Sequence, residues 1–309
     1  MKYYFIVNPG SRTGHGRELW NELEAKIIES GIEYEVFFTA GAGDATRIAE
    51  QICTEHPEMK RIVIAGGDGT ANEAINGLRD YGSFILGYLP TGSSNDLARG
   101  LGITQDHFEA LDRVLHPKNF RSVDHGVVNY LDDGTAARSF AVSAGIGYDA
   151  DICYEALTSP LKTFLNRIHL GKLIYYILGV KLIFTNKRAR ATFTIDGTRK
   201  LATSSLLFAA AMNTEYEGGG MPMGPGADPT DGKLTVCIVH DISRLKHMLL
   251  MSSIIKAKHI KHKGVELITC SSIEIETDRP LVLHTDGEFA GKHSHVRLEC
   301  KKEKARMML

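Results

Sequence analysis

The sequence predicts an α/β N-terminal half, built on a parallel sheet with flanking helices, and a mainly antiparallel, β-sandwich-like C-terminal half. Three observations support this fold class. Apolar strand-like runs alternate with amphipathic helices over residues 1–125, which is typical of a parallel sheet with right-handed crossovers. From about residue 126 the strand-like runs are instead separated by hairpin turns. Finally, 31 of the 309 residues are glycine, and these cluster after the expected strands.

The N-terminal strands are continuous apolar runs, as expected of strands that are covered on both faces. Leu19, Leu23 and Ile27 recur four residues apart and predict a helix that ends at Gly31. The complete set for this half is strands at 3–7, 36–38, 61–65 and 84–89, and helices over 19–27, 44–52 and 71–78.

In the C-terminal half, Asp132-Asp133-Gly134 and Asp196-Gly197 are hairpin turn signals. We expect strands at 191–195, from 201 onward, and at 234–239, 273–276, 281–284 and 296–298, with helical segments over 160–185 and 243–261. The chain is accordingly divided into domains 1–125 and 126–289. The tail, 290–309, is compatible with packing back on the first domain.

Composition excludes several classes of protein. The 36 Lys and Arg balance the 37 Asp and Glu to a net charge of −1, which argues against a strongly basic nucleic-acid binder. Five cysteines without a CxxC pair indicate neither a disulfide framework nor a zinc site, and favour reduced thiols in the cytoplasm. The longest apolar stretch, 173–184, contains Lys181 and is shorter than the ~18 residues of a membrane span. We therefore expect a soluble protein or one that lies on a membrane surface.

A glycine-rich loop, Gly66-Gly67-Asp68-Gly69-Thr70, follows a buried strand and precedes a helix. The amides and dipole of a helix N-terminus attract phosphate, and glycine lets the backbone approach it. Asp68 is placed to reach a magnesium ion or its waters. The alternative is a tight turn, but the strand–loop–helix context favours phosphate binding.

Two further polar loops follow the first and fourth strands, at 8–14 and 92–96. In a parallel sheet all three loops meet at the carboxyl edge, where ligands bind. The P-loop pattern GxxxxGK[ST] is absent, so a nucleotide here would be held without a Walker lysine.

Three other patterns are weaker. Gly145-Ile146-Gly147 resembles a dinucleotide fingerprint but lies in the antiparallel half, so we interpret it as a strand-end turn. The oxygen-rich segment 224–233 fits a hard-cation site or a plain hairpin turn equally well. His284-Thr285-Asp286-Gly287-Glu288 puts two carboxylates on a turn, where one could act as a general base or both could simply be solvated.

The thirteen histidines do not by themselves indicate a metal site. His259 and His262, like His293 and His295, lie among Lys and Ser without a suitably spaced third ligand. We therefore expect these histidines to be solvated.

Taken together, these residues resemble the diacylglycerol kinase catalytic family, particularly its soluble bacterial lipid kinases. The resemblance covers nearly the whole chain in order. It depends on Asn8-Pro9, the Gly66–Glu73 segment, the run Gly92-Ser93-Ser94-Asn95-Asp96-Leu97-Ala98-Arg99, Asp124, and Asp286-Gly287-Glu288. The GGDGT element is shared with NAD kinases and phosphofructokinases, so the later motifs carry the assignment.

The resemblance implies an α/β nucleotide domain over 1–125, a lipid-substrate domain over 126–289, and ATP and Mg²⁺ as cofactors. It implies an ATP site formed by Asn8, Pro9, Gly10, Ser11, Arg12, Thr39, Gly66, Gly67, Asp68, Gly69, Thr70, Asn72, Glu73 and Ser93. Ser93 stands where the family often has threonine, but it keeps the hydroxyl.

The resemblance also implies catalytic and metal roles. Asp68, Asp96 and Asp124 match the acidic network around the catalytic magnesium. Asp286 and Glu288 match the positions that deprotonate the lipid hydroxyl, and which of the two is the base stays open. A structural magnesium site is implied at Asp228, Asp231 and the carbonyl of Lys233.

The predicted activity is therefore transfer of the γ-phosphoryl group of ATP to a hydroxyl of diacylglycerol or a related lipid. The alternatives are an NAD kinase, disfavoured because Ser94-Asn95-Asp96 replaces an Asn-Asn-Asp loop, and a catalytically silent nucleotide-binding module on a membrane surface. The acceptor lipid and the oligomeric state, a homodimer included, stay open. No nucleic-acid partner is expected.

The near-zero net charge hides a polarised distribution. Residues 156–200 carry nine Lys and Arg against one Asp, and 243–263 add six with no acid. Basic helices with apolar side chains could bind an anionic membrane, or could be ordinary solvated faces. A peripheral position on the inner face of the membrane is thus compatible with the sequence.

Overall fold

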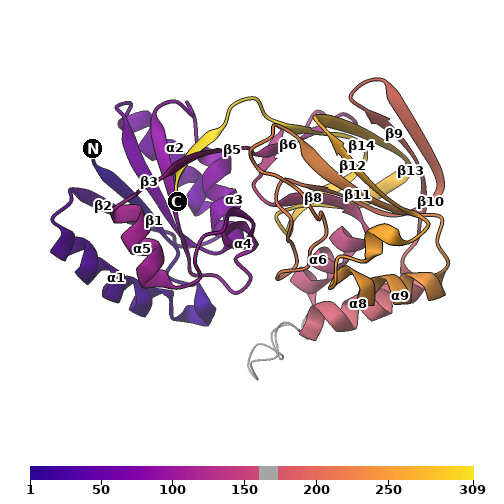
Figure 1. Ribbon diagram of the computed structural model, residues 1–309, viewed down its shortest axis with the longest axis horizontal. Coiled ribbons are helices and arrows are strands. Elements are labelled where there is room, and N and C mark those ends of the chain that lie inside the picture. The colour runs from indigo at the N-terminus through magenta and orange to yellow at the C-terminus, as the bar shows by residue number, and fades with distance from the viewer. Residues whose placement is uncertain (160–172) are drawn as a thin grey trace.

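The computed structural model describes residues 1–159 and 173–309. It has two lobes, each built around its own sheet, and the chain passes from the first lobe to the second after β5 and returns after β14 (Figure 1). The predicted fold class, an α/β half followed by an antiparallel β-rich half, is confirmed.

The first sheet has six strands in the order β2-β1-β3-β4-β15-β5. Their bounds are β1 (Tyr3–Val7), β2 (Tyr34–Phe38), β3 (Lys60–Gly66), β4 (Phe84–Pro90), β5 (Phe120–Val123) and β15 (Ala305–Met308). Strands β1 to β4 are parallel, so their carboxyl ends meet at one edge. β15, from the end of the chain, lies parallel to β4 and antiparallel to β5.

Helices cover both faces of this sheet, because the apolar runs of its strands present side chains to both sides. On one face lie α1 (Gly16–Ser30) and α5 (His107–Leu115). On the other lie α2 (Asp44–Glu55), α3 (Asp68–Gly77) and α4 (Asp96–Leu101). α3 begins at Asp68, so half of the glycine-rich loop is the first turn of a helix. A short 3₁₀ turn, η1 (Arg12–Gly14), precedes α1.

The second sheet is antiparallel throughout, in the order β12-β11-β10-β8-β13-β14-β6-β7. β9 pairs with both β10 and β13, so the sheet curls around an apolar core. The predicted hairpins at 132–134 and 196–197 are confirmed. The strands are β6 (Gly126–Tyr130), β7 (Arg138–Phe140), β8 (Ser143–Gly147), β9 (Ala189–Ile195), β10 (Arg199–Met212), β11 (Leu234–His240), β12 (Val265–Cys270), β13 (Ser272–Thr285) and β14 (Glu288–Cys300).

Among the described residues of this lobe, three helices and a 3₁₀ turn pack against the sheet. They are α6 (Tyr148–Thr158), α8 (Leu173–Thr185), α9 (Arg244–Ile254) and η2 (His259–Lys261). The expected helix over 160–185 is found from 173 onward, and its first part lies outside the described residues. Gly147 has a φ of +106°, ends β8 and is followed directly by α6. Since both neighbours of β8 are antiparallel, this segment is a strand-end turn and not a dinucleotide site.

The expectation that the histidines are solvated was wrong for two of the four considered. His259 has no exposed surface and its Nε2 contacts the carbonyl of Met223. His293 is 4% exposed and lies against Asp132. For His293 the flanking Lys and Ser residues misled the prediction, because successive residues of a strand point to opposite faces. His259 instead begins the 3₁₀ turn η2, which turns its side chain inward while its neighbours Lys258 and Ile260 are exposed.

Candidate active site

The three polar loops predicted to meet at the carboxyl edge of the first sheet do meet there. Asn8 Nδ2 donates to Thr70 Oγ1 at 2.9 Å, which joins the first loop to the glycine-rich loop. Thr91 Oγ1 donates to Ser11 Oγ at 3.0 Å, which joins the first loop to the loop after β4. The convergence is therefore direct contact between side chains of all three loops.

The glycines of these loops are required by close backbone approach. A Cβ on Gly92 would lie 2.4 Å from the Cα of Gly67, and a Cβ on Gly66 would lie 2.5 Å from Thr70. Without side chains here, the backbone amides at the start of α3 stay accessible to an anion. This is the arrangement by which helix N-termini bind phosphate.

Asp68 and Asp96 are held together by the backbone of α4. The two carboxylate oxygens of Asp68 accept from the amides of Asp96 and Leu97, both at 3.0 Å, and burial raises the pKa of Asp68 to about 6. Asp96 is 4% exposed. Its Oδ2 accepts from the amide of Gly219 at 2.7 Å, whereas its Oδ1 has no hydrogen-bond partner among the described residues.

The sequence analysis missed the role of Gly219. It is the centre of a Gly-Gly-Gly run, 218–220, in which every φ is positive, a conformation that favours glycine. This run turns the backbone so that an amide of the second lobe reaches Asp96 in the first. The three consecutive glycines were the signal that could have revealed it.

Asp124 lies at the junction of the lobes and contacts the predicted metal turn rather than Asp68 or Asp96. Its Oδ2 accepts from the amide of Gly232 at 2.7 Å, and its Oδ1 lies 2.8 Å from Lys304 Nζ. In the turn itself, Asp228 Oδ1 accepts from the amide and hydroxyl of Thr230. Asp231 Oδ1 accepts from the amide of Lys233.

Asp286 is the anchor of the turn between β13 and β14. Its carboxylate accepts four hydrogen bonds of 2.8–2.9 Å: from the amides of Ala141, Val142 and Ser143, and from Asn72 Nδ2. Its φ of +50°, followed by +82° at Gly287, is the conformation of a tight hairpin turn. The carboxylate of Asp286 is thus committed to holding the turn.

Glu288, two residues later, reaches the glycine-rich loop instead. Its Oε1 lies 3.0 Å from the point that a Cβ on Gly69 would occupy, and the residue is half-buried. The turn therefore brings a carboxylate of the second lobe to the N-terminus of α3 in the first. The amide of Gly287 also donates to His284 Nδ1 at 3.2 Å, a further hydrogen bond that stabilises the turn.

Several residues of the expected nucleotide set have other partners. Asn72 binds Asp286 and accepts from Arg138, so it links the lobes. Glu73 accepts from the amides of Gly43 and Ala45 at the start of α2. The remainder line the three loops or their rims: Asn8, Pro9, Gly10, Ser11, Arg12, Thr39, Gly66, Gly67, Gly69, Thr70 and Ser93.

A buried titratable group lies behind the turn. His284 Nε2 is 3.2 Å from Asp149 Oδ2. Burial opposes the charged form of His284, but the carboxylates of Asp149, Glu217 and Asp286 together outweigh it and raise the pKa of the imidazole. Glu217, which precedes the Gly-Gly-Gly run, is 8% exposed, and burial raises its pKa to about 7.

The chain can now be compared with known proteins. Residues 2–128 match the family described as diacylglycerol kinase catalytic domain, and residues 143–306 match the YegS C-terminal NAD kinase beta sandwich-like domain. The chain belongs to the diacylglycerol kinase family. It is 31% identical to YtlR of Bacillus subtilis (strain 168), over 94% of each chain. It is 28% identical to the diacylglycerol kinase of the same organism, over 98% of this chain and 97% of that one.

Solved structures share the fold of this kinase family member. A crystal structure of a diacylglycerol kinase from Bacillus anthracis aligns with a TM-score of 0.74 at 22% identity, covering 99% of this chain and 96% of that one. An NAD kinase from Archaeoglobus fulgidus in complex with ATP aligns with a TM-score of 0.52 at 12% identity, covering 100% and 94%. The resemblance seen in the sequence is thus confirmed at the level of family and fold.

Proposed function

We propose that this kinase transfers the γ-phosphoryl group of ATP to a hydroxyl of diacylglycerol or a related lipid, with Glu288 as the general base. The observation that supports this best is the approach of Glu288 to Gly69, at the N-terminus of α3. A carboxylate of one lobe thereby lies beside a helix N-terminus of the other lobe, and helix N-termini are suited to binding phosphate. Asp286, whose oxygens are occupied by four donors, positions the turn and does not take the proton.

In the proposed reaction, Glu288 removes the proton of the acceptor hydroxyl as its oxygen attacks the γ-phosphorus. The bond from that phosphorus to the β–γ bridging oxygen breaks, and ADP leaves. Phosphoryl transfer depends mainly on in-line positioning and charge neutralisation. The amides at the start of α3 and the glycines of the surrounding loops supply the positioning of the phosphates.

The acidic side chains fit a magnesium ion. Asp96 Oδ1 is buried without a hydrogen-bond partner among the described residues, and its ion pair with Arg99 Nε is long, at 3.7 Å. A divalent ion or its waters would give this carboxylate oxygen closer partners. We propose that Asp68 and Asp96 hold the catalytic Mg²⁺, which neutralises phosphate charge when bound. Asp124 then joins them through water, and Asp228, Asp231 and the Lys233 carbonyl form a separate structural site.

An acceptor panel tests the proposed function. The full-length chain is incubated with γ-labelled ATP, Mg²⁺ and, separately, dispersed diacylglycerol, phosphatidylglycerol, a sphingoid base and NAD⁺. We expect label in at least one lipid and none in NAD⁺. Label in NAD⁺ alone would support an NAD kinase, and label in no acceptor would support a silent module; either result contradicts the proposal.

We propose further that α8 and α9 place the enzyme on an anionic membrane. No helix among the described residues is long and apolar enough to cross a bilayer. The two helices lie side by side on the second lobe (Figure 1). They expose large apolar side chains, including Val180, Phe184, Leu245, Met248 and Leu249.

Basic side chains surround these apolar ones, as anionic lipid requires. The exposed ones near α9 are Arg244, Lys246, Lys256, Lys258, Lys261 and Lys263. Of the basic residues counted in 156–200, Lys162, Arg167 and Lys172 lie outside the described residues. The pattern of apolar residues among cations favours membrane contact over an ordinary solvated face.

Vesicle flotation tests this surface. Leu249→Gln, at a side chain 61% exposed, should reduce binding to vesicles containing phosphatidylglycerol several-fold, because less apolar area enters the interface. Ile28→Gln, at a similarly exposed position on α1 in the other lobe (64%), is the matched control and should bind like the wild type. Equal binding of both variants, or binding that salt does not weaken, would contradict the proposed surface.

A further inference from the structure

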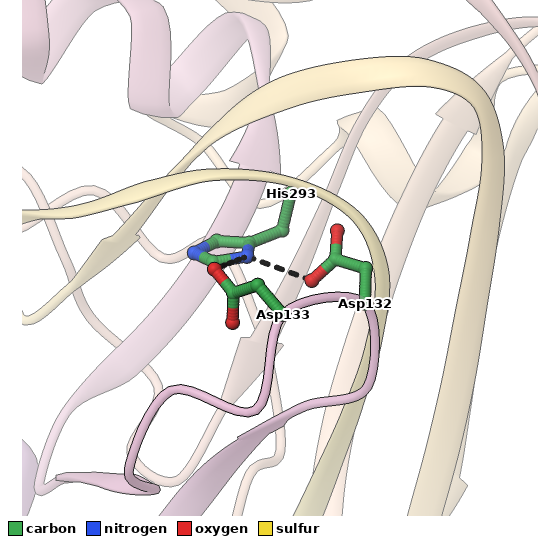
Figure 2. A group of neighbouring side chains, drawn as sticks. All are labelled: Asp132, Asp133 and His293. Atoms are coloured by element: carbon green, nitrogen blue, oxygen red, sulfur yellow. Dashed lines mark hydrogen bonds and ion pairs between the residues drawn. The ribbon is translucent and has the colours of Figure 1, made fainter.

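A histidine and two aspartates of the second lobe converge on one another (Figure 2). Asp132 and Asp133 come from the β6–β7 turn, and His293 comes from β14. His293 Nδ1 lies 3.0 Å from Asp132 Oδ1 and 3.6 Å from Asp133 Oδ2. His293 is five residues from Glu288, so the two lie at most about 17 Å apart along the chain.

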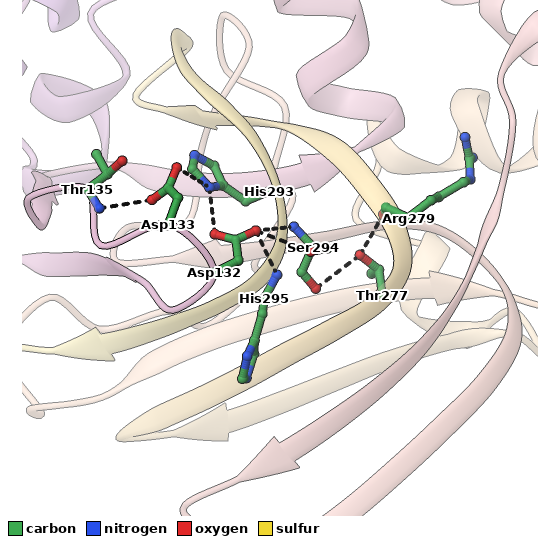
Figure 3. A network of polar contacts seen from close by, with 8 residues as sticks. All are labelled: Asp132, Asp133, Thr135, Thr277, Arg279, His293, Ser294 and His295. Carbon is green, nitrogen blue, oxygen red and sulfur yellow. Dashed lines mark hydrogen bonds and ion pairs between the residues drawn. The ribbon is translucent and has the colours of Figure 1, made fainter.

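The outer oxygens of both aspartates are already fixed by the backbone (Figure 3). Asp132 Oδ2 accepts from the amides of Ser294 and His295, at 2.7 and 3.3 Å. Asp133 Oδ1 accepts from the amide of Thr135 at 2.9 Å. Each carboxylate therefore turns its other oxygen toward the imidazole, which is how outer hydrogen bonds orient metal ligands.

The imidazole is held in place as well. His293 is 4% exposed, and its ring packs against Tyr130 with the centroids 4.3 Å apart. Gly291, with a φ of +99°, leaves room for the ring, because a Cβ there would lie 2.3 Å from His293 Nε2. The imidazole is thus fixed, whereas Asp132 and Asp133 lie on an exposed turn and are oriented by the hydrogen bonds of their outer oxygens.

Spacing and charge both fit a small divalent transition metal ion. Zinc bonds to histidine nitrogen and carboxylate oxygen at about 2.0–2.2 Å, so the ligand atoms around a tetrahedral zinc ion lie roughly 3.3 Å from one another. The 3.0 and 3.6 Å from His293 Nδ1 to the two carboxylate oxygens bracket this value. Without a metal ion, even a protonated imidazole balances only one of the two carboxylate charges. A divalent cation beside a neutral imidazole balances both. Mg²⁺ prefers oxygen ligands alone and is not expected here.

We propose that Asp132, Asp133 and His293 bind one Zn²⁺ ion or a similar first-row divalent ion, with water completing the coordination. The ion would join the β6–β7 turn to β14, the strand that begins with Glu288. This site is separate from the proposed magnesium sites, and it does not depend on the kinase activity.

The test is a Zn²⁺ titration of the chelator-treated full-length protein by calorimetry, with millimolar Mg²⁺ present. We expect one saturable site for Zn²⁺. Asp133→Asn should lower its affinity about 100-fold, because losing a metal ligand costs at least as much affinity as losing a residue that hydrogen-bonds to a ligand. Asp133 is 48% exposed and the asparagine keeps the acceptor for Thr135, so folding should be preserved. His293→Gln should abolish binding.

His295→Gln is the matched control. His295, also on β14, faces an acid of β13, with its Nε2 2.8 Å from Glu274 Oε1, but Arg297 occupies the second oxygen of that glutamate. This variant should bind Zn²⁺ like the wild type. The protein loaded with Co²⁺ should show the visible absorption of a tetrahedral ion, and Asp133→Asn should not. No saturable binding, or equal binding by Asp133→Asn and the wild type, would overturn the proposal.

Discussion

Asp286 and Glu288, two carboxylates separated by one glycine, have different surroundings, and our assignment of a positioning role to one and a base to the other depends on this difference. Asp286 accepts three backbone amides and one side-chain amide, so its oxygens point into the structure. Glu288 points to Gly69 across the lobes. The sequence motif alone could not separate the two, because both are acids on the same turn.

Asp286→Asn tests the positioning role at the level of stability. In the variant, an NH₂ group replaces one carboxylate oxygen and cannot accept hydrogen bonds from the donors that surround it. Hydrogen bonds to a charged group contribute about 1.5–3 kcal/mol each. We expect the free energy of unfolding, measured by denaturant titration, to fall by about 3 kcal/mol. Glu288→Gln is the comparison and should change it by only about 0.5 kcal/mol. An Asp286→Asn protein as stable as the wild type would show that the anchor is unimportant.

At the scale of elements, α9 carries a histidine that behaves as an apolar ring. His247 is fully buried and neither ring nitrogen has a hydrogen-bond partner among the described residues. Its ring packs edge-on against Tyr148 at 4.3 Å. Burial lowers the pKa of His247 to about 4, so the folded protein holds it neutral.

His247→Phe should therefore flatten the pH dependence of stability. His247 binds a proton below about pH 6.5 in the unfolded chain, but only below about pH 4 in the folded chain. The wild type therefore loses stability as the pH falls through this window. At pH 5 the loss from this residue is about 2 kcal/mol. We expect the variant, compared with the wild type by denaturant titration, to gain that amount at pH 5 relative to pH 7.5. His116→Phe, at an exposed site on the first lobe, should show no such gain.

The elements of the first lobe were largely predictable because local patterns determine them. The expected strand 3–7 is found as β1, and 84–89 is found within β4. The start of α3 at Asp68 and the short helix α4 were not predicted, because their ends are fixed by contacts from other parts of the chain. Asp68, for example, accepts from the first amides of α4.

At the scale of the whole molecule, side chains from α3 tie the lobes together. Asn72 donates to Asp286 and to the carbonyl of Ser139, and Asn76 accepts from the amide of Ser139. The resemblance assigns Asn72 to the nucleotide site, and in this structure its side chain contacts Asp286 in the β13–β14 turn. Such a role depends on residues 67 and 214 positions away, which no local pattern reveals.

The same limit explains the other features that the sequence did not show. The Asp132, Asp133 and His293 cluster joins residues about 160 positions apart in sequence. The return of β15 to the first sheet places the end of the chain beside β4. A strand can be recognised from its own residues, but the strand that it pairs with cannot be identified in this way when a chain contains many strands. The motifs therefore predicted which loops meet at the edge of the first sheet, and the structure shows which of their side chains contact one another.

The central claim is that Glu288 accepts the proton during phosphoryl transfer to a lipid. The most direct measurement is single-turnover transfer from labelled ATP to the accepted lipid by Glu288→Gln, with ATP affinity measured in parallel. We predict a fall in rate of about 10²–10⁴-fold, the usual contribution of a general base, with ATP affinity unchanged. A variant that transfers phosphate at the wild-type rate would contradict the assignment.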